Sequence, residues 1–311
     1  MPEPFIPPAW NYNPSTWGQR LPLVIIALIG MFIALYLGAY QVRWIDDVWE
    51  PFFGDGSKRI LDSSISKILP IPDAFLGAFG YFADVVTGVI GKTSRWKTMP
   101  WMVIVFGVAV GPLGMVSILL VISQPVFLDA WCSLCLLTAV ISVVMSSPAM
   151  DEMLASLQYL QRVKRNGLSV WKAFWGNKEI ANQINKLIMR LQVINILAGL
   201  FIMFIPYLWD YNKELSSHNY ITGPLVVTFA ITALWEVNRN ARWLNIPVAA
   251  WLIISSILYG DDQVIYPNII AAILVIILSA IKRKSKNIYG GGWRSLFQKN
   301  PPHIQQANNK V

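Results

Sequence analysis

The sequence has few charged residues and almost no histidine. Charged residues make up only 14% of the 311 residues, whereas hydrophobic residues make up 55%. With a mean hydropathy of +0.49, this composition is far from that of soluble globular domains. His218 and His303 fall in segments that we predict on opposite sides of a membrane. Two cysteines without further ligands do not make a metal site, so we expect neither metal nor haem.

A nucleic-acid surface and an export signal are also missing. The net charge is +8, but the basic residues lie between apolar blocks and form no aromatic-interleaved surface, so nucleic acid is not an expected partner. No basic leader precedes the first apolar block, and no Ala-x-Ala site follows it. That block should therefore remain as a transmembrane helix. The residues before it, with Trp10 and Trp17, form either an interfacial lead-in or a disordered tail.

Apolar residues gather in eight stretches that approach the roughly 20 residues needed for a helix to cross a bilayer. This pattern predicts an all-α integral membrane protein with about eight transmembrane helices, surrounded by membrane lipid. The stretches are 22–40, 74–90, 100–122, 126–146, 191–208, 220–236, 243–259 and 264–281.

The distribution of basic residues predicts the orientation. With the N-terminus inside, 20 of the 25 Lys and Arg residues lie on the cytoplasmic side, where such residues are enriched. Both termini are thus expected in the cytoplasm. The start of the fourth helix and the long loop 41–73 are expected on the outer face, where the loop is either a lid or a solvated linker.

Three segments follow from this pattern. Residues 1–148 are expected to form a four-helix bundle with the outer loop 41–73, and residues 191–311 a second four-helix membrane domain with a basic tail. Between them, Ser147-Pro148 followed by Asp151 and Glu152 predicts a helix start. The apolar stripe that follows predicts an amphipathic linker, 149–190, on the cytoplasmic membrane surface; its residues are Met150, Met153, Leu154, Leu157 and Leu160.

The last four helices contain an internal repeat with a period of about 50 residues. Asn195, Gly199 and Phe201 align with the second copy, Asn245, Ala249 and Trp251. Both copies begin inside, so the repeat unit is a helical hairpin duplicated in parallel. We find no chemistry in this half of the sequence.

Both cysteines of the chain lie together, in Asp129-Ala-Trp-Cys132-Ser-Leu-Cys135. Residues at i and i+3 share one face of a helix, so the pair can close into a disulfide after local adjustment. A thiol in the first helical turn is favoured as the reactive thiolate by the helix dipole. Asp129 either caps this helix or opposes the thiolate. The alternative to redox chemistry is that both cysteines simply pack as small apolar side chains.

The first four helices, over about residues 20–147, resemble the vitamin K epoxide reductase family in its bacterial disulfide-forming branch. The resemblance rests on the acidic residue before Cys-x-x-Cys, the Ser-bearing outer loop, and Ile71-Pro-Asp73-Ala-Phe-Leu-Gly77 with Tyr81. It implies a four-helix bundle around a quinone, with the loop as a cap. It also implies that Cys135 meets the quinone, together with Asp73 and Tyr81, and that Cys132 exchanges with an extracytoplasmic thioredoxin-like thiol protein.

The sequence departs from that family at two places. Family members usually carry a second cysteine pair in the outer loop, and Ser57 stands where the later of these would be. They also often have an Asn and a Tyr where this chain has Asp73 and Ala139. The second half resembles the SPW-repeat membrane domain, on the basis of Gly223-Pro224, Ala233-Leu-Trp-Glu-Val-Asn-Arg-Asn240 and the Trp251 hairpin.

Two functional hypotheses from different classes remain. The first is a membrane thiol oxidoreductase that couples the Cys132–Cys135 disulfide to quinone reduction and to oxidation of the thiol partner. The second is a non-catalytic membrane scaffold or assembly factor that kept the bundle and lost the electron relay. A transporter is third. Asp84, inside a predicted helix, is either part of a proton route or a hydrogen-bonded structural residue.

Overall fold

Helices form over all eight predicted membrane stretches in the computed structural model, which describes residues 6–67, 70–176, 192–208, 211, 213–235, 237–260, 262–281 and 289–308. Those residues contain no β-strand, only an isolated bridge between Trp10 and Tyr289. The eight long helices are α1 (Trp17–Gln41), α3 (Asp73–Val89), α5 (Pro100–Leu128), α6 (Ser133–Arg165), α8 (Gln192–Leu208), α9 (Lys213–Thr232), α10 (Asn245–Tyr259) and α11 (Asp262–Ala280). The short elements are α2 (Gly56–Leu61), α4 (Arg95–Thr98), α7 (Val170–Phe174), η1 (Arg239–Leu244), η2 (Trp293–Phe297) and α12 (Pro302–Asn308).

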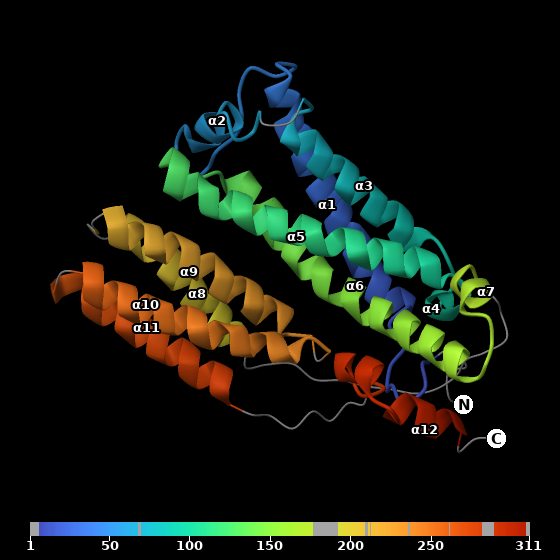
Figure 1. The fold of residues 1–311 in the computed structure, drawn as a ribbon. Helices are drawn as coiled ribbons and strands as arrows, with labels where there is room; N and C mark the ends of the chain where they lie inside the picture. Colours follow the sequence, from blue (N-terminus) through green and yellow to red (C-terminus); the bar gives the residue numbers. More distant parts are fainter. Residues whose placement is uncertain are drawn as a thin grey trace.

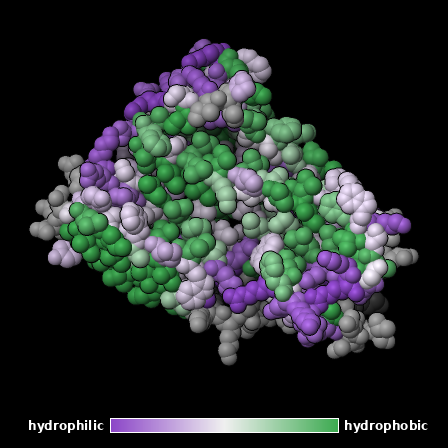
Figure 2. Space-filling model, in the orientation of Figure 1, coloured by the Kyte–Doolittle hydropathy of each residue, from purple (hydrophilic) through white to green (hydrophobic). Residues whose placement is uncertain are grey.

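The outer surface of these helices is suited to lipid. Among the described residues, four helical stretches are long and apolar enough to cross a membrane, namely α1, α5, α6 and the continuous run Arg239–Tyr259. Large side chains such as Phe32, Phe79 and Leu119 are 64%, 67% and 65% exposed, which in water would leave extensive apolar patches. Figure 2 shows apolar side chains covering the helix flanks and hydrophilic ones gathered around α2 and near α12. The chain is therefore an all-α, multi-pass membrane protein.

The helices form two packed groups (Figure 1). In the first, α1 packs on α3 and α5 on α6; in the second, α8 packs on α9 and α10 on α11. The groups touch each other because α9 packs against both α5 and α6. The loop helix α2 lies at one end of the first group, and α12 lies at the opposite end (Figure 1).

The start of the fourth long helix differs from the prediction. Residues 126–128 continue α5, which ends where Asp129 adopts a left-handed backbone conformation with φ of 46°. Helix α6 then runs unbroken from Ser133 to Arg165. The predicted new helix at Ser147-Pro148 is therefore wrong: Pro148 lies inside α6, where a proline is tolerated when neighbouring groups satisfy the backbone.

Helix α6 is longer than a membrane is thick. Its 33 residues extend about 50 Å, against roughly 30 Å for a hydrocarbon core. Residues 149–165 therefore extend a membrane helix instead of forming a separate surface helix. The remainder of the predicted linker includes 177–190, which lies outside the described residues.

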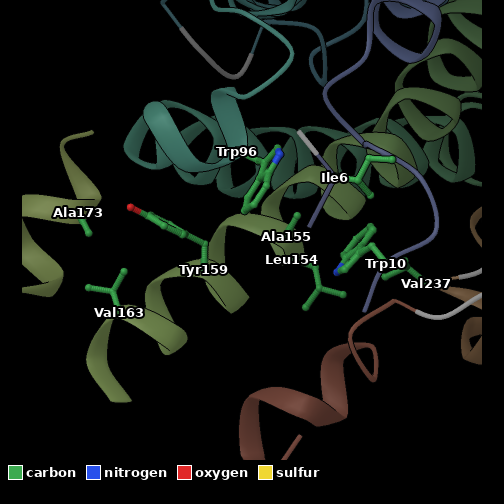
Figure 3. Packing of buried hydrophobic residues seen from close by; sticks show 9 residues of the cluster. All are labelled: Ile6, Trp10, Trp96, Leu154, Ala155, Tyr159, Val163, Ala173 and Val237. Carbon is green, nitrogen blue, oxygen red and sulfur yellow. The ribbon is translucent and has the colours of Figure 1, made fainter. Parts of the chain in front are cut away.

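The projecting part of α6 is buried by both ends of the chain. Leu154 and Tyr159, of which the first belongs to the predicted amphipathic stripe, pack with Trp96 of α4 and with Ile6 and Trp10 of the N-terminal segment (Figure 3). Partly buried residues near the C-terminus pack on the same cluster. The N-terminal residues from Ile6 onward are thus not a disordered tail, because Trp10 is only 2% exposed; Trp17, the other predicted interfacial residue, is 46% exposed.

The acids of the predicted helix start have a different role from the one expected. Glu152 forms a buried ion pair with Arg95, with 2.5 Å between Nη2 and Oε2, and it also accepts a hydrogen bond from Ser15. Asp151 accepts a hydrogen bond from Tyr12. These contacts fasten α4 and the N-terminal segment to α6.

The predicted repeat is visible in the second helical group. Asn219 of α9 and Asn268 of α11, which are 49 positions apart, exchange two amide hydrogen bonds of 2.9 and 3.0 Å and are fully buried. Residues at equivalent positions of the two copies therefore meet at the interface between the hairpins. Asn195 and Asn245, which begin the two copies, are also fully buried.

Candidate functional site

The Cys-x-x-Cys lies at the beginning of α6, as predicted. Cys132 is the N-cap residue and has an extended backbone, and Cys135 lies in the first turn. The two form a disulfide, and the Cys132 Sγ accepts a hydrogen bond from the Cys135 N–H at 3.1 Å. Gln124, near the end of α5, accepts a hydrogen bond from the Cys132 N–H at 3.0 Å. These two hydrogen bonds tie Cys132, in the connection between α5 and α6, to both helices.

Asp129 does not cap the helix that carries the cysteines. It is the C-cap of α5, and its exposed carboxylate lies 3.7 Å from Lys213 Nζ on α9. The sulfur of Cys132 occupies the capping position itself, facing the first N–H groups of α6. These groups carry the partial positive charge that favours a thiolate.

The two cysteines differ in burial. Cys132 is 0% exposed and packs against Ile60 of α2 and Ala130. Cys135 is partly exposed and packs beside Leu134 with an apolar cluster that includes Leu37 of α1. A reaction partner in solution therefore cannot reach Cys132 while α2 stays in place.

Part of the loop 41–73 folds over the disulfide. Arg59 of α2 donates hydrogen bonds to the carbonyls of Leu128 at 2.8 Å and Asp129 at 3.1 Å. A side chain at Gly56 would place its Cβ 2.1 Å from the Trp131 carbonyl oxygen, so only glycine permits the observed approach. The loop is therefore a docked lid on the connection between α5 and α6, as one of the two alternatives predicted.

One lid residue reaches the helix that bears the cysteines. Glu50 accepts hydrogen bonds from the Ser133 N–H at 2.9 Å and from the Ser133 hydroxyl, and a third from the Ser57 hydroxyl at 2.5 Å. Burial raises the pKa of Glu50, but hydrogen bonds from Ser133 and Ser57 outweigh this and leave that pKa below its usual value. Glu50 is thus an anion at the N-terminus of α6. Sequence reasoning missed it, since 83 positions separate it from Ser133.

The residues expected at a quinone lie at two levels of the bundle. Asp73 begins α3 and accepts hydrogen bonds from Gln41 at 2.6 Å and Ser66 at 3.2 Å, and its neighbour Ala74 packs on the same cluster as Cys135. Tyr81 is eight residues further along α3, about 12 Å. Its hydroxyl donates to the Thr138 carbonyl at 2.6 Å and lies 2.8 Å from the Ser142 hydroxyl. Ala74 and Asp73 thus lie beside the cluster of Cys135, and the Tyr81 hydroxyl meets α6 at Thr138, three positions after Cys135.

Trp131, next to Cys132, joins the two halves of the chain. Its ring packs against Phe204 of α8 and Tyr220 of α9, with centroid separations of 5.4 and 5.6 Å. Phe53 of the lid stacks on Phe204 at 6.4 Å. Ala139 lies in the same cluster. The second helical group is therefore part of the wall around the disulfide.

Asp84 lies apart from the disulfide. It lines a cavity at the other end of α3 together with Arg20, Arg95 and Glu152. Asp84 therefore neither contacts Cys135 nor belongs to the lid.

Comparisons with known proteins give two separate matches, one in each helical group. Residues 21–147 match the vitamin K epoxide reductase family, and residues 189–282 match the SPW repeat domain. No curated protein and no solved structure matches the chain. The disulfide at the start of α6 lies within the first match, and the helices that pack on Trp131 lie within the second. The chain thus carries an N-terminal segment that matches the vitamin K epoxide reductase family and a C-terminal segment that matches the SPW repeat domain.

Proposed function

We propose that this protein is a membrane thiol–disulfide oxidoreductase whose Cys132–Cys135 disulfide oxidises an extracytoplasmic thioredoxin-like protein and passes the electrons to a quinone. The observation that carries the proposal is the disulfide in the first turn of α6. It contains both cysteines of the chain. The family of residues 21–147 supports the same reaction class.

The exchange step follows ordinary thiol–disulfide chemistry. A thiolate of the partner attacks Cys132, the S–S bond breaks, and Cys135 leaves as a thiolate. The second thiol of the partner then displaces Cys132, so the partner gains a disulfide and this chain holds two thiols. Because Cys132 is buried beneath Ile60, the attack requires α2 to leave its docked position.

The surroundings of Cys135 support a quinone at the second half of the reaction. Leu37, Ala74 and Leu134 give an apolar wall, and the Gln41 amide, which donates one N–H to Asp73, carries a second N–H of the kind that a carbonyl oxygen accepts. A bound quinone supplies an acceptor for two electrons and two protons. In this proposal Cys135, Asp73 and Tyr81 contact it, and hydrogen bonds to Thr138 and Ser142 hold the Tyr81 hydroxyl.

The membrane arrangement belongs to the same proposal. Eight spans with both termini in the cytoplasm put α2 and the disulfide on the outer face, where a secreted thiol protein reaches them, in a bacterial inner membrane. The three-part organisation stays a proposal, with α6 continuing through its first boundary at residue 148 as far as Arg165.

A trapping experiment tests the exchange step. A Cys135→Ala variant should accumulate a mixed disulfide through Cys132 that is absent from a Cys132→Ala, Cys135→Ala double variant. The adduct should disappear on reduction and contain a thioredoxin-like protein. If no partner is captured and the native pair stays reduced in oxidising cells, the proposal fails.

A scaffold function is the second candidate. The complete burial of Cys132 and the loop without cysteines favour it, because no built-in relay delivers electrons to the disulfide. Purified protein separates the two candidates. Quinone reduction by an added dithiol, lost in the Cys135→Ala variant, rejects the scaffold; absence of both bound quinone and turnover rejects the oxidoreductase.

A further inference from the structure

We infer that Glu50 is a positioning residue that restrains the thiolate of Cys132 and makes the disulfide less oxidising while the lid is docked. The inference deepens the proposed function and rests on it. It assigns to a loop carboxylate the control of reactivity at a cysteine 82 positions later in the sequence.

The geometry places two negative groups at one helix end. The Cys132 sulfur accepts a hydrogen bond from the N–H of Cys135, and the Glu50 carboxylate accepts one from the N–H of Ser133. Both groups accept hydrogen bonds from N–H groups in the first turn of α6, which have no partner within the helix. Both therefore lie at the positive end of the helix dipole. When the disulfide is reduced, a thiolate at Cys132 must form within about one helical turn of an existing anion, which is unfavourable.

The charges near this helix end include one cation that offsets part of the charge of Glu50. Arg59 of α2 donates hydrogen bonds to the carbonyls of Leu128 and Asp129, which are neutral and leave its positive charge in place. Lys58 is paired with Asp47 and Asp55. On the opposite side, Asp129 faces Lys213 of α9.

The effect of the Glu50 charge on thiolate formation at Cys132 can be estimated from the separation of the two charges. Two unit charges about 5.4 Å apart, at an effective dielectric constant near 20, shift an equilibrium by about a hundredfold. Solvent screening at the rim of the site reduces this, so we expect about tenfold or more. For a two-electron couple, each tenfold change corresponds to about 30 mV.

The position of Glu50 in the lid couples this effect to access. The lid segment that carries Ile60 over Cys132 also carries Glu50 and its partner Ser57. Displacement of the lid therefore uncovers the sulfur and removes the anion together. The Cys132 thiolate becomes available when a partner is present and is disfavoured when the site is closed.

The test is the midpoint potential of the cysteine pair in the purified full-length protein, measured against glutathione from pH 5.5 to 9. The reaction breaks the Cys132–Cys135 bond, forms oxidised glutathione from two glutathione molecules, and leaves two thiols in the protein. The variant is Glu50→Gln, which keeps an oxygen to accept the Ser133 N–H. The matched control is Asp129→Asn, which removes an exposed carboxylate that is closer to Cys132 in sequence.

Glu50→Gln should favour reduction by about tenfold or more at high pH, which raises the potential by about 30 mV or more. The difference should vanish at low pH, where both thiols are protonated and carry no charge for Glu50 to repel. Asp129→Asn should follow the wild type. A merely structural contribution of Glu50 would shift the potential equally at all pH values or leave it unchanged, and either result overturns the inference.

A second measurement does not require the Glu50→Gln variant to be stable. In the Cys135→Ala protein with Glu50 intact, the thiol pKa of Cys132, read from the pH dependence of alkylation, should not lie below the usual value of about 8.5 despite its N-cap position. A value well below about 8.5 overturns the inference. If the cysteine pair equilibrates with glutathione but captures no partner and reduces no quinone, the proposed function fails while the inference about Glu50 remains testable.

Discussion

Replacement of Gly56 by alanine should open the lid. The new Cβ would lie 2.1 Å from the Trp131 carbonyl oxygen, whereas ordinary contacts begin near 3.4 Å. The Cβ is attached rigidly to the backbone and the Trp131 oxygen is a backbone atom, so no side-chain rotation relieves the overlap, and α2 must move by about 1 Å or more. The Gly56 substitution therefore acts on docking rather than on the chemistry of the sulfurs.

The energy at stake follows from the contacts that dock α2. Burial of Ile60 against Cys132 contributes about 2 kcal/mol, and the two exposed hydrogen bonds of Arg59 contribute about 0.5 kcal/mol each. Loss of half of this total of about 3 kcal/mol increases the open fraction by about tenfold. We expect the reduced Gly56→Ala variant, in a Cys135→Ala background, to react with maleimide at Cys132 about ten times faster.

A control separates lid opening from a general loss of stability. Gly111→Ala on α5 adds a methyl group with nothing within 4 Å, so its alkylation rate should equal that of the parent. If folded Gly56→Ala protein reacts at the parental rate, the docked lid does not govern access to Cys132, and the reasoning is refuted.

Three further predictions concern the rest of the fold. Glu152→Gln leaves Arg95 buried without its ion-pair partner, which should cost about 3 to 5 kcal/mol and lower Tm; an unchanged Tm contradicts the account. Burial lowers the pKa of His303 to about 4, so the unfolded chain binds a proton more readily between about pH 6.5 and 4. Stability should therefore fall by at most about 3 kcal/mol as pH falls through that window, and His303→Gln should remove the dependence in thermal melts. Trp131→Ala should loosen the contact with Tyr220, seen as faster hydrogen exchange in both α6 and α9; a change confined to α6 contradicts a shared wall.

The membrane helices and the position of the cysteines could be predicted from the sequence. Lipid requires long apolar runs with internally satisfied backbones, so eight such runs mark eight helices without knowledge of their packing. The spacing of Cys132 and Cys135 reports helix geometry directly. Both features depend on residues close together in the chain.

The predictions that failed concern features that depend on contacts between residues far apart in the sequence. Pro148 with Asp151 and Glu152 reads as a helix start by local rules, but α6 runs through them, and the two acids bind Arg95 and the N-terminal segment instead. The role of Glu50 was equally hidden, because its partner Ser133 is 83 positions away. An acid in an otherwise aromatic stretch, Trp49-Glu50-Pro51-Phe52-Phe53, is the one local signal, and it names no partner.

The most direct measurement is the redox state of Cys132 and Cys135 in the native membrane, trapped by rapid acidification and labelled with a mass-tagged maleimide. The account predicts an oxidised pair in respiring cells and a reduced pair when the quinone pool is depleted. A pair that stays reduced in oxidising cells, or one whose state ignores the quinone pool, contradicts the claim that this disulfide carries electrons from thiols to the membrane.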